Sequence, residues 1–167
     1  MKQLQSKRLY FKKIQQDDVD FLTKFLSDPE LTKYLPLRRP YLTKEIESYL
    51  TGRISHWQTH DFGVFILILK STNRKAGYCG LEYVGDTNYI DIRYGILSEY
   101  SGKGMIQEAA RGMIEYGFNI LKLPVIYGAA IPENRASIEI LKKIDMKSNQ
   151  EVNFYGDIVD YYSIQNS

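Results

Sequence analysis

The residues best suited to chemistry surround a glycine-containing segment in the middle of the chain. Residues 96–110 read Ile-Leu-Ser-Glu-Tyr-Ser-Gly-Lys-Gly-Met-Ile-Gln-Glu-Ala-Ala. An apolar strand therefore ends, a Gly102-Lys103-Gly104 loop follows, and an amphipathic helix begins at once. This order presents several backbone N–H groups at a helix N-terminus, an arrangement that binds anions and especially phosphates. An ordinary strand-to-helix turn would also explain the glycines, and the spacing matches neither a Walker loop nor a dinucleotide fingerprint.

A second polar segment opens another helix near residues 131–146. Asn134 and Ser137 lie three positions apart, so both side chains can share the first turn of that helix. Taken alone, the pair is explained by ordinary helix capping, which Asn and Ser do well.

The elements that must hold these segments in place follow from the apolar periodicity. Short turns between the middle strands imply antiparallel hairpins, and a helix crossover before a further strand implies a parallel pair. The fold class is therefore α+β, with a mixed, mostly antiparallel central sheet of about six to seven strands and flanking helices. Thr43 is the expected N-cap of the second helix. We expect strands at residues 9–14, 62–69, 76–84, 89–97 and 125–131, helices at 19–26, 43–60, 105–121 and 136–144, and a closing hairpin of 151–155 and 159–164 around Gly156-Asp157.

Length and composition limit the class of protein. The 167 residues, 44% of them hydrophobic, fit one globular domain over residues 1–167. The net charge of +2 gives no large basic excess for a nucleic-acid partner. The longest apolar stretch, residues 62–69, is too short to cross a bilayer, and the first residues contain no secretory signal. We therefore expect a soluble, cytoplasmic protein with no membrane partner.

The histidines and the single cysteine are weak candidates for a site. His56 and His60 lie four apart, a spacing that can hold a metal, but no nearby carboxylate accompanies them. We expect packing or surface roles for both and no bound metal. Because Cys79 is the only cysteine in the sequence, the chain can form neither an internal disulfide nor a metal site made of thiolates alone. It lies within a strand pattern, where a buried, inert thiol is expected.

Taken together and in this order, the segments resemble the GNAT superfamily of acyl-CoA-dependent N-acetyltransferases, and within it the Rim-type branch that acetylates protein N-termini. The resemblance covers nearly the whole chain. Its pieces are residues 76–81, Tyr94, Gly102-Lys103-Gly104, Glu108-Ala109, Asn134-x-x-Ser137, residues 143–146, and Gly156-Asp157 with Asp160.

Three positions depart from the family pattern. Glu99 stands where the family has Gln or Arg before the glycine loop, and Leu141 stands where many members have a tyrosine. Asp145-Met146 replaces the usual Gly-Phe, and we expect Asp145 to take the left-handed helix cap that Asp tolerates better than most residues.

The resemblance implies a fold, a reaction and a set of site residues. The fold is the GNAT fold, and the reaction moves an acetyl group from acetyl-CoA to a primary amine, here a protein N-terminus. Asn134 and Ser137 would belong to the acetyl-CoA site, no metal takes part, and a homodimer is compatible with the family. The resemblance assigns backbone N–H groups to the thioester, from Ile96 and Leu97, and to the pyrophosphate, from Gly102, Lys103, Gly104 and Met105.

Proton transfer requires further groups. Glu82 and Asp91 are carboxylates on neighbouring strands near the expected cleft, and Asp91 occupies a position where the Rim-type pattern often has Glu. Alternation along the strand puts Asp91 and Arg93 on one face. A general base and an ion pair with Arg93 or a neighbouring strand's basic residue are therefore both open for Asp91. Ser137 could pass a proton to the leaving thiolate, since Leu141 cannot, and water is the alternative.

Two other functions stay open. A small-molecule acetyltransferase acting on a polyamine or aminoglycoside would need an acidic cleft, which the sequence does not show. A catalytically silent acyl-CoA-binding or protein-interaction module would fit the Glu99 and Leu141 departures. No motif identifies the acceptor, although several tyrosines could line a pocket for an amine or a peptide end: Tyr83, Tyr89, Tyr94 and Tyr155.

Overall fold

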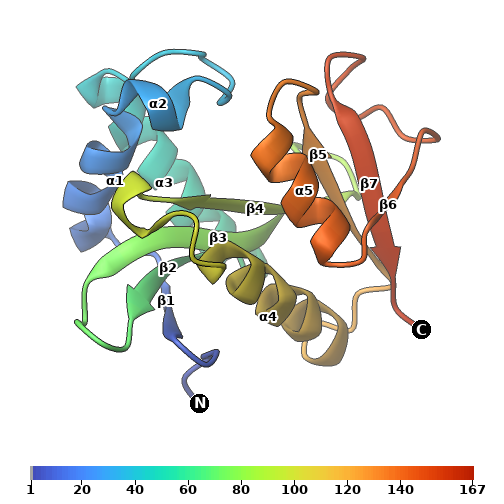
Figure 1. The fold of residues 1–167 in the computed structure, drawn as a ribbon, viewed down its shortest axis with the longest axis horizontal. Helices are drawn as coiled ribbons and strands as arrows, with labels where there is room; N and C mark the ends of the chain where they lie inside the picture. The colour runs from blue at the N-terminus through green and yellow to red at the C-terminus, as the bar shows by residue number, and fades with distance from the viewer. Residues whose placement is uncertain (1) are drawn as a thin grey trace.

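A computed structural model describes residues 2–167, which form one seven-stranded sheet with helices on both faces (Figure 1). The expected order of elements is confirmed except for the short helix α2, which was not predicted. In chain order the elements are β1 (Leu9–Lys13), α1 (Val19–Leu26), α2 (Pro29–Thr32), α3 (Thr43–His60), β2 (Val64–Leu69), β3 (Lys75–Tyr83), β4 (Ile90–Ile96), α4 (Met105–Asn119), β5 (Val125–Ala130), α5 (Arg135–Lys143), β6 (Lys147–Ser148) and β7 (Asp160–Gln165). Short 3₁₀ turns precede α1 and follow β4, at Gln16–Asp18 and Ser98–Tyr100.

The sheet order is β1-β2-β3-β4-β5-β7-β6. Every neighbouring pair is antiparallel except β4 and β5, which run parallel. The mixed, mostly antiparallel sheet expected from the sequence is therefore confirmed. Within residues 2–167, no helix is both long and apolar enough to cross a membrane.

Alternate residues of the central strands face different helices. Phe25 of α1 packs edge-on against Tyr78 of β3, at a ring-centroid distance of 5.2 Å. On the other face, a Cβ at Gly117 of α4 would lie 2.9 Å from Leu81. The α1 and α3 helices therefore cover one face of the sheet, and α4 covers the opposite face.

The two parallel strands separate soon after they meet. Their register contains a single residue pair, Asp91 with Tyr127, although β4 continues to Ile96 and β5 to Ala130. Figure 1 shows β4 and β5 running in clearly different directions. A gap in the strand pairing thus opens toward their carboxyl ends, where α4 and α5 begin. In sheets with parallel strands, ligands bind at this end.

Two boundaries differ from the sequence predictions. The strand predicted at 151–155 is wrong: β6 covers only Lys147–Ser148, and residues 149–159 form a long connection to β7. Its aromatic residues suggested a strand, but Tyr155 donates its backbone N–H to the Tyr161 hydroxyl at 2.7 Å and not to a neighbouring strand. The helix α3 has Leu42 and not Thr43 as its N-cap, because the Glu45 carboxylate accepts the Leu42 N–H at 2.8 Å.

The helix cap expected at Asp145 is confirmed. Asp145 follows α5 with φ +70°, the left-handed conformation in which glycine is the usual residue.

Candidate active site

Backbone groups of β4 face the gap that opens between β4 and β5. The Leu97 N–H donates to the Ala76 oxygen of the β3 side at 2.9 Å. Because successive N–H groups in a strand point in opposite directions, the Ile96 N–H points toward the gap. Ile96 can therefore donate to a ligand there, and its assignment to the thioester stays a prediction. The same prediction for Leu97 is corrected, because its N–H is taken up by the sheet.

The glycine loop forms an open cradle at the start of α4. Gly102 and Gly104 have φ +77° and +78°, and Gly104 is the N-cap of α4 without a side-chain cap. Within residues 2–167, the N–H groups of Gly102, Lys103 and Gly104 donate no hydrogen bond to another group. A Cβ at Gly102 would meet no atom within 4 Å. The exposed donors and the helix dipole fit a pyrophosphate at Gly102, Lys103, Gly104 and Met105.

A carboxylate on α4 fixes the N-terminal segment beside this loop. Glu108 accepts hydrogen bonds from the Ser6 hydroxyl, from the Arg8 N–H at 2.8 Å and from Arg8 Nε at 2.7 Å. Burial alone would raise the pKa of Glu108, but these bonds outweigh it and lower the pKa below its usual value. Arg8 also donates from Nη1 to the Lys103 oxygen at 2.9 Å.

The start of α5 lies across the gap from β4. Asn134 caps α5, and its Oδ1 accepts the Ser137 N–H at 3.3 Å. The Tyr94 hydroxyl lies 2.8 Å from Ser137 Oγ and 3.0 Å from the Ser137 oxygen. Burial raises the pKa of Tyr94, so its hydroxyl stays protonated. The Tyr94 hydroxyl therefore links β4 to α5. Asn134 and Ser137, the two residues predicted at the start of α5, both lie near the carboxyl ends of β4 and β5.

The two predicted carboxylates lie together on the α3 side of the sheet. Glu82 of β3 and Asp91 of β4 are directly paired across the strands. Arg93 contacts both, with Nη1 2.7 Å from Glu82 Oε1 and Nε 3.1 Å from Asp91 Oδ1. Arg53 of α3 reaches the other Glu82 oxygen at 2.7 Å. Two carboxylates and two guanidinium groups therefore form a charge-balanced cluster, and the ion pair that the sequence left open is present.

Asp91 and Glu82 differ in whether arginines occupy both of their carboxylate oxygens. Burial raises the pKa of both carboxyl groups, and the neighbouring arginines oppose the rise. Each Glu82 oxygen is occupied by an arginine of the cluster. The second oxygen of Asp91 instead accepts the hydroxyl of Tyr155. Tyr155 belongs to the long connection before β7 and is 38% exposed, whereas Asp91 is 4% exposed. The second oxygen of Asp91 is therefore held by a partly exposed tyrosine and not by an arginine.

An aromatic cluster lies next to Asp91. Phe154 is its centre, with ring-centroid distances of 4.8 to 5.7 Å to four tyrosines. Two of these are the predicted pocket residues Tyr89 and Tyr155, and two were not predicted, Tyr127 and Tyr161. Aromatic faces attract alkylammonium groups, so this surface suits an amine that approaches Asp91.

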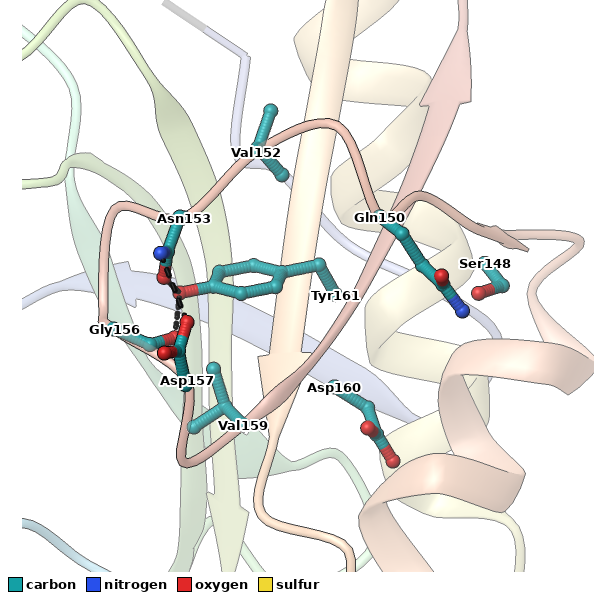
Figure 2. A pocket seen from close by; sticks show the side chains of 9 residues that line it. All are labelled: Ser148, Gln150, Val152, Asn153, Gly156, Asp157, Val159, Asp160 and Tyr161. Carbon is teal, nitrogen blue, oxygen red and sulfur yellow. Dashed lines mark hydrogen bonds between the residues drawn. The ribbon is translucent and has the colours of Figure 1, made fainter.

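The Tyr161 hydroxyl holds the connection that carries Tyr155. It accepts the Tyr155 N–H at 2.7 Å. It also donates to the Gly156 oxygen at 2.7 Å, while Asn153 Nδ2 donates to Asp157 at 3.0 Å (Figure 2). A cavity of about 340 Å³ lies beside this turn. Asp157 and Asp160 line it, and no basic residue does.

The remaining candidate residues have structural partners. His56 Nε2 accepts the Tyr83 N–H at 3.0 Å, so its Nδ1 donates to the Phe62 oxygen at 2.8 Å. Burial lowers the pKa of His56, and neither ring nitrogen is left for a metal. No group of three or more metal-binding side chains occurs in the part of the chain that the structure describes.

Structural roles also explain three other residues singled out in the sequence: Cys79, Glu99 and Leu141. Cys79 is fully buried, which raises the pKa of its thiol and keeps it inert, as predicted. Glu99 pairs with Lys24 of α1 at 2.9 Å. Leu141 is 1% exposed and packs in the core.

Sequence reasoning missed Arg53 and Phe154. Arg53 lies over the Tyr49 ring at 4.8 Å. The two residues are four positions apart on α3, and this spacing is the one local indication in the sequence of where the Arg53 side chain lies. Nothing in the sequence showed that α3 would bring Arg53 to Glu82. Phe154 was hidden by the wrong strand prediction.

Comparison with known proteins places this geometry in a family. The model of the acetyltransferase (GNAT) domain matches residues 8–147. The chain belongs to this family of N-acetyltransferases, as its sequence and fold suggested. It is 29% identical over 170 residues to an uncharacterized N-acetyltransferase, p20, of Bacillus licheniformis, covering 97% of this chain and 94% of the relative.

Solved structures share the fold. A spermidine N-acetyltransferase from Vibrio cholerae, in complex with CoA and spermine, has a TM-score of 0.76 and 18% identity, covering 95% of this chain and 96% of the other. A ribosomal-protein-S5-alanine acetyltransferase from Vibrio fischeri has a TM-score of 0.77 and 17% identity, covering 100% and 98%. At these identities the comparison establishes the fold alone.

Proposed function

We propose that this N-acetyltransferase uses acetyl-CoA to acetylate the α-amine of a peptide or protein chain. The observation that carries the proposal is the charge balance beside Asp91, where two carboxylates face two guanidinium groups. Such a site offers one carboxylate to one ammonium group and has no surplus negative charge for a polycation. Family members described as acting on ribosomal proteins and on spermidine share the fold, so the charge of the acceptor site is the distinguishing feature.

The chemistry of an α-amine suits this site. Its ordinary pKa is about 7.7–8.0, against about 10.4 for a lysine. A carboxylate with a raised pKa can therefore take the proton from an α-amine more readily than from a lysine side chain. The surrounding aromatic rings provide an apolar surface for the residue that carries the amine.

In the proposed reaction each of these residues has a separate role. The ammonium group displaces Tyr155 from Asp91, and Asp91 accepts its proton directly or through a water molecule. The neutral amine attacks the thioester carbon that acetyl-CoA supplies. The Ile96 N–H donates to the thioester oxygen as negative charge develops on it. As the carbon–sulfur bond breaks, the attacking nitrogen loses its second proton to water. The Ser137 hydroxyl, hydrogen-bonded to Tyr94, gives a proton to the leaving sulfur and regains that proton through the water.

A small polyamine is the second candidate acceptor. The cavity with Asp157 and Asp160 and no basic residue is the observation that favours it (Figure 2). A second ammonium group of a polyamine could bind there while the first reacts.

The test compares three acceptors at equal concentration. They are a peptide with a free α-amine, the same peptide acetylated at its N-terminus but containing a lysine, and spermidine. Release of the CoA thiol and the mass of the product are measured. We expect kcat/KM to be at least about tenfold higher for the free α-amine, because a single-charge site gains little from further amines. A preference for spermidine would favour the second candidate, and CoA binding without acetylation of any acceptor would favour a silent module.

A further inference from the structure

One buried hydroxyl group anchors the turn that carries Tyr155. Tyr161 of β7 is 7% exposed, and its hydroxyl oxygen accepts the Tyr155 N–H at 2.7 Å. The single proton of this hydroxyl faces two acceptors of the same turn, the Gly156 oxygen at 2.7 Å and Asn153 Oδ1 at 3.3 Å (Figure 2). Three residues of one turn are therefore bound to a single phenol group.

We infer that Tyr161 is a positioning residue of the acceptor site, because its hydroxyl fixes this turn and thereby holds the Tyr155 hydroxyl on Asp91. This role rests on the proposed function, in which Asp91 receives the proton of the acceptor amine. Tyr161 acts on Asp91 only through Tyr155.

The turn has few other anchors. Within residues 2–167, the hydrogen bonds that join residues 152–158 to the rest of the chain end on the Tyr161 hydroxyl, on Asp91 or on Arg93. The bonds to Asp91 and Arg93 are made by the Tyr155 hydroxyl itself. No other hydrogen bond of this part of the chain therefore fixes where the Tyr155 side chain begins.

The remaining contacts of the turn would survive the loss of the Tyr161 hydroxyl. The Phe154 ring lies 5.0 Å from the Tyr161 ring and 5.0 Å from the Tyr155 ring, and a phenylalanine at position 161 would keep this packing. Water can replace the lost hydroxyl, because Tyr155 and Gly156 are exposed. Tyr161→Phe should therefore loosen the turn without unfolding the protein.

The contact with Tyr155 influences the charge of Asp91. Burial raises the pKa of Asp91, and the hydrogen bonds from Arg93 and Tyr155 oppose this rise. Loss of the Tyr155 bond should therefore raise the pKa of Asp91 further. The ionisable side chains around Asp91 come from β3, β4, β5 and α3 as well as from the turn: Glu82, Arg93, Tyr127, Arg53 and Tyr155.

Carbon-13 NMR titration of the Asp91 carboxyl group in the free protein tests the positioning without any acceptor. We expect Tyr155→Phe to raise the pKa of Asp91 by about one unit, because a hydrogen bond to a charged group is lost. Tyr161→Phe should raise it by at least about half as much. Tyr162→Phe is the matched control, because Tyr162 is also 7% exposed on β7 and its hydroxyl makes no hydrogen bond within residues 2–167. It should leave the titration unchanged.

The double variant Tyr155→Phe/Tyr161→Phe separates positioning from a general structural effect. If Tyr161 acts through Tyr155, the pKa of Asp91 shifts no further in the double variant than in Tyr155→Phe. The acid limb of kcat/KM for an α-amine peptide should move to higher pH in the same order, with CoA affinity unchanged in each variant. The Tyr155 amide should also exchange with solvent at least about tenfold faster in Tyr161→Phe.

An unshifted Asp91 titration in folded Tyr161→Phe, additive shifts in the double variant, or unchanged exchange of the Tyr155 amide would overturn the inference. The titrations and the exchange need no acceptor, so their outcome is independent of the proposed function. A shifted Asp91 titration with an unshifted acid limb would support the positioning by Tyr161 and reject Asp91 as the base.

Discussion

Replacing Gly104 by Val tests the pyrophosphate cradle most sharply, because the structure separates its effect on folding from its effect on binding. Gly104 has φ +78°, and a Cβ there would meet only Arg8 Nη2 within 4 Å, at 3.6 Å. The folded protein can therefore accommodate the side chain, at the cost of left-handed backbone strain of roughly 1–2 kcal/mol. For a chain of this size, that strain lowers the melting temperature by about 2–8 °C.

The same side chain projects into the place of the pyrophosphate. Calorimetric affinity for CoA should fall at least about tenfold, which corresponds to about 1.4 kcal/mol. Gly85→Val is the matched control, because Gly85 also has positive φ, +52°, and a Cβ there would meet no atom within 4 Å. It should show a comparable melting shift and unchanged CoA affinity. Unchanged CoA affinity in folded Gly104→Val, or an equal loss in Gly85→Val, would refute the assignment of the loop.

Three further predictions follow from particular contacts. Tyr155→Phe removes a hydrogen bond that favours the ionised form of Asp91, so the pKa of Asp91 should rise, and the acid limb of the kcat/KM profile should move to higher pH; an unshifted limb would show that Asp91 does not control it. Glu108 has a lowered pKa in the folded state, so its contribution to stability is present at neutral pH and is lost as the pH falls through that pKa. Glu108→Gln should therefore cost about 1 kcal/mol at pH 7 in urea unfolding and flatten the loss of stability below about pH 5, and wild-type pH dependence in the variant would contradict this. Gly80→Ala would place a Cβ 2.4 Å from the Val64 Cα and should destabilise by about 3 kcal/mol or more, whereas Gly52→Ala, open on α3, should stabilise by about 0.5–1 kcal/mol; similar melting temperatures for the two variants would refute the packing argument.

The features that were predictable from the sequence are those set by short segments. The Gly102-Lys103-Gly104 loop is defined by a strand end, two glycines and the apolar stripe of α4, all within one stretch of chain. The Asp145 cap and the buried Cys79 were likewise determined by their immediate neighbours. For these residues local propensity and tertiary structure agree.

The features that were not predictable depend on register and on contacts between distant segments. Alternation put Asp91 and Arg93 on one face, but only the β3–β4 register shows Glu82 opposite Asp91, and only the packing of α3 brings Arg53 to it. The Leu97 amide was misassigned because a one-residue change reverses the direction of a strand N–H.

The strand prediction for residues 151–155, in the connection before β7, was wrong for a different reason. Its aromatic residues have high β-propensity, which measures how well a side chain fits a pleated, half-buried surface. Phe154 and Tyr155 do lie on such a surface, but as side chains of a loop held by the Tyr161 hydroxyl. Sequence alone could not separate the two arrangements.

Turnover of Asp91→Asn, with saturating acetyl-CoA and an α-amine peptide and normalised to folded protein, tests the central claim that Asp91 receives the proton of the acceptor amine. The substitution keeps the side-chain size and removes the charge. We expect kcat to fall about 10²-fold or more, the lower range for positioned acid–base groups, with CoA affinity nearly unchanged. Glu82→Gln, which alters the same ion-pair cluster without uncovering an oxygen to the amine, should lower turnover far less. Near-normal turnover of Asp91→Asn at neutral pH would contradict the account and leave the cluster a structural one.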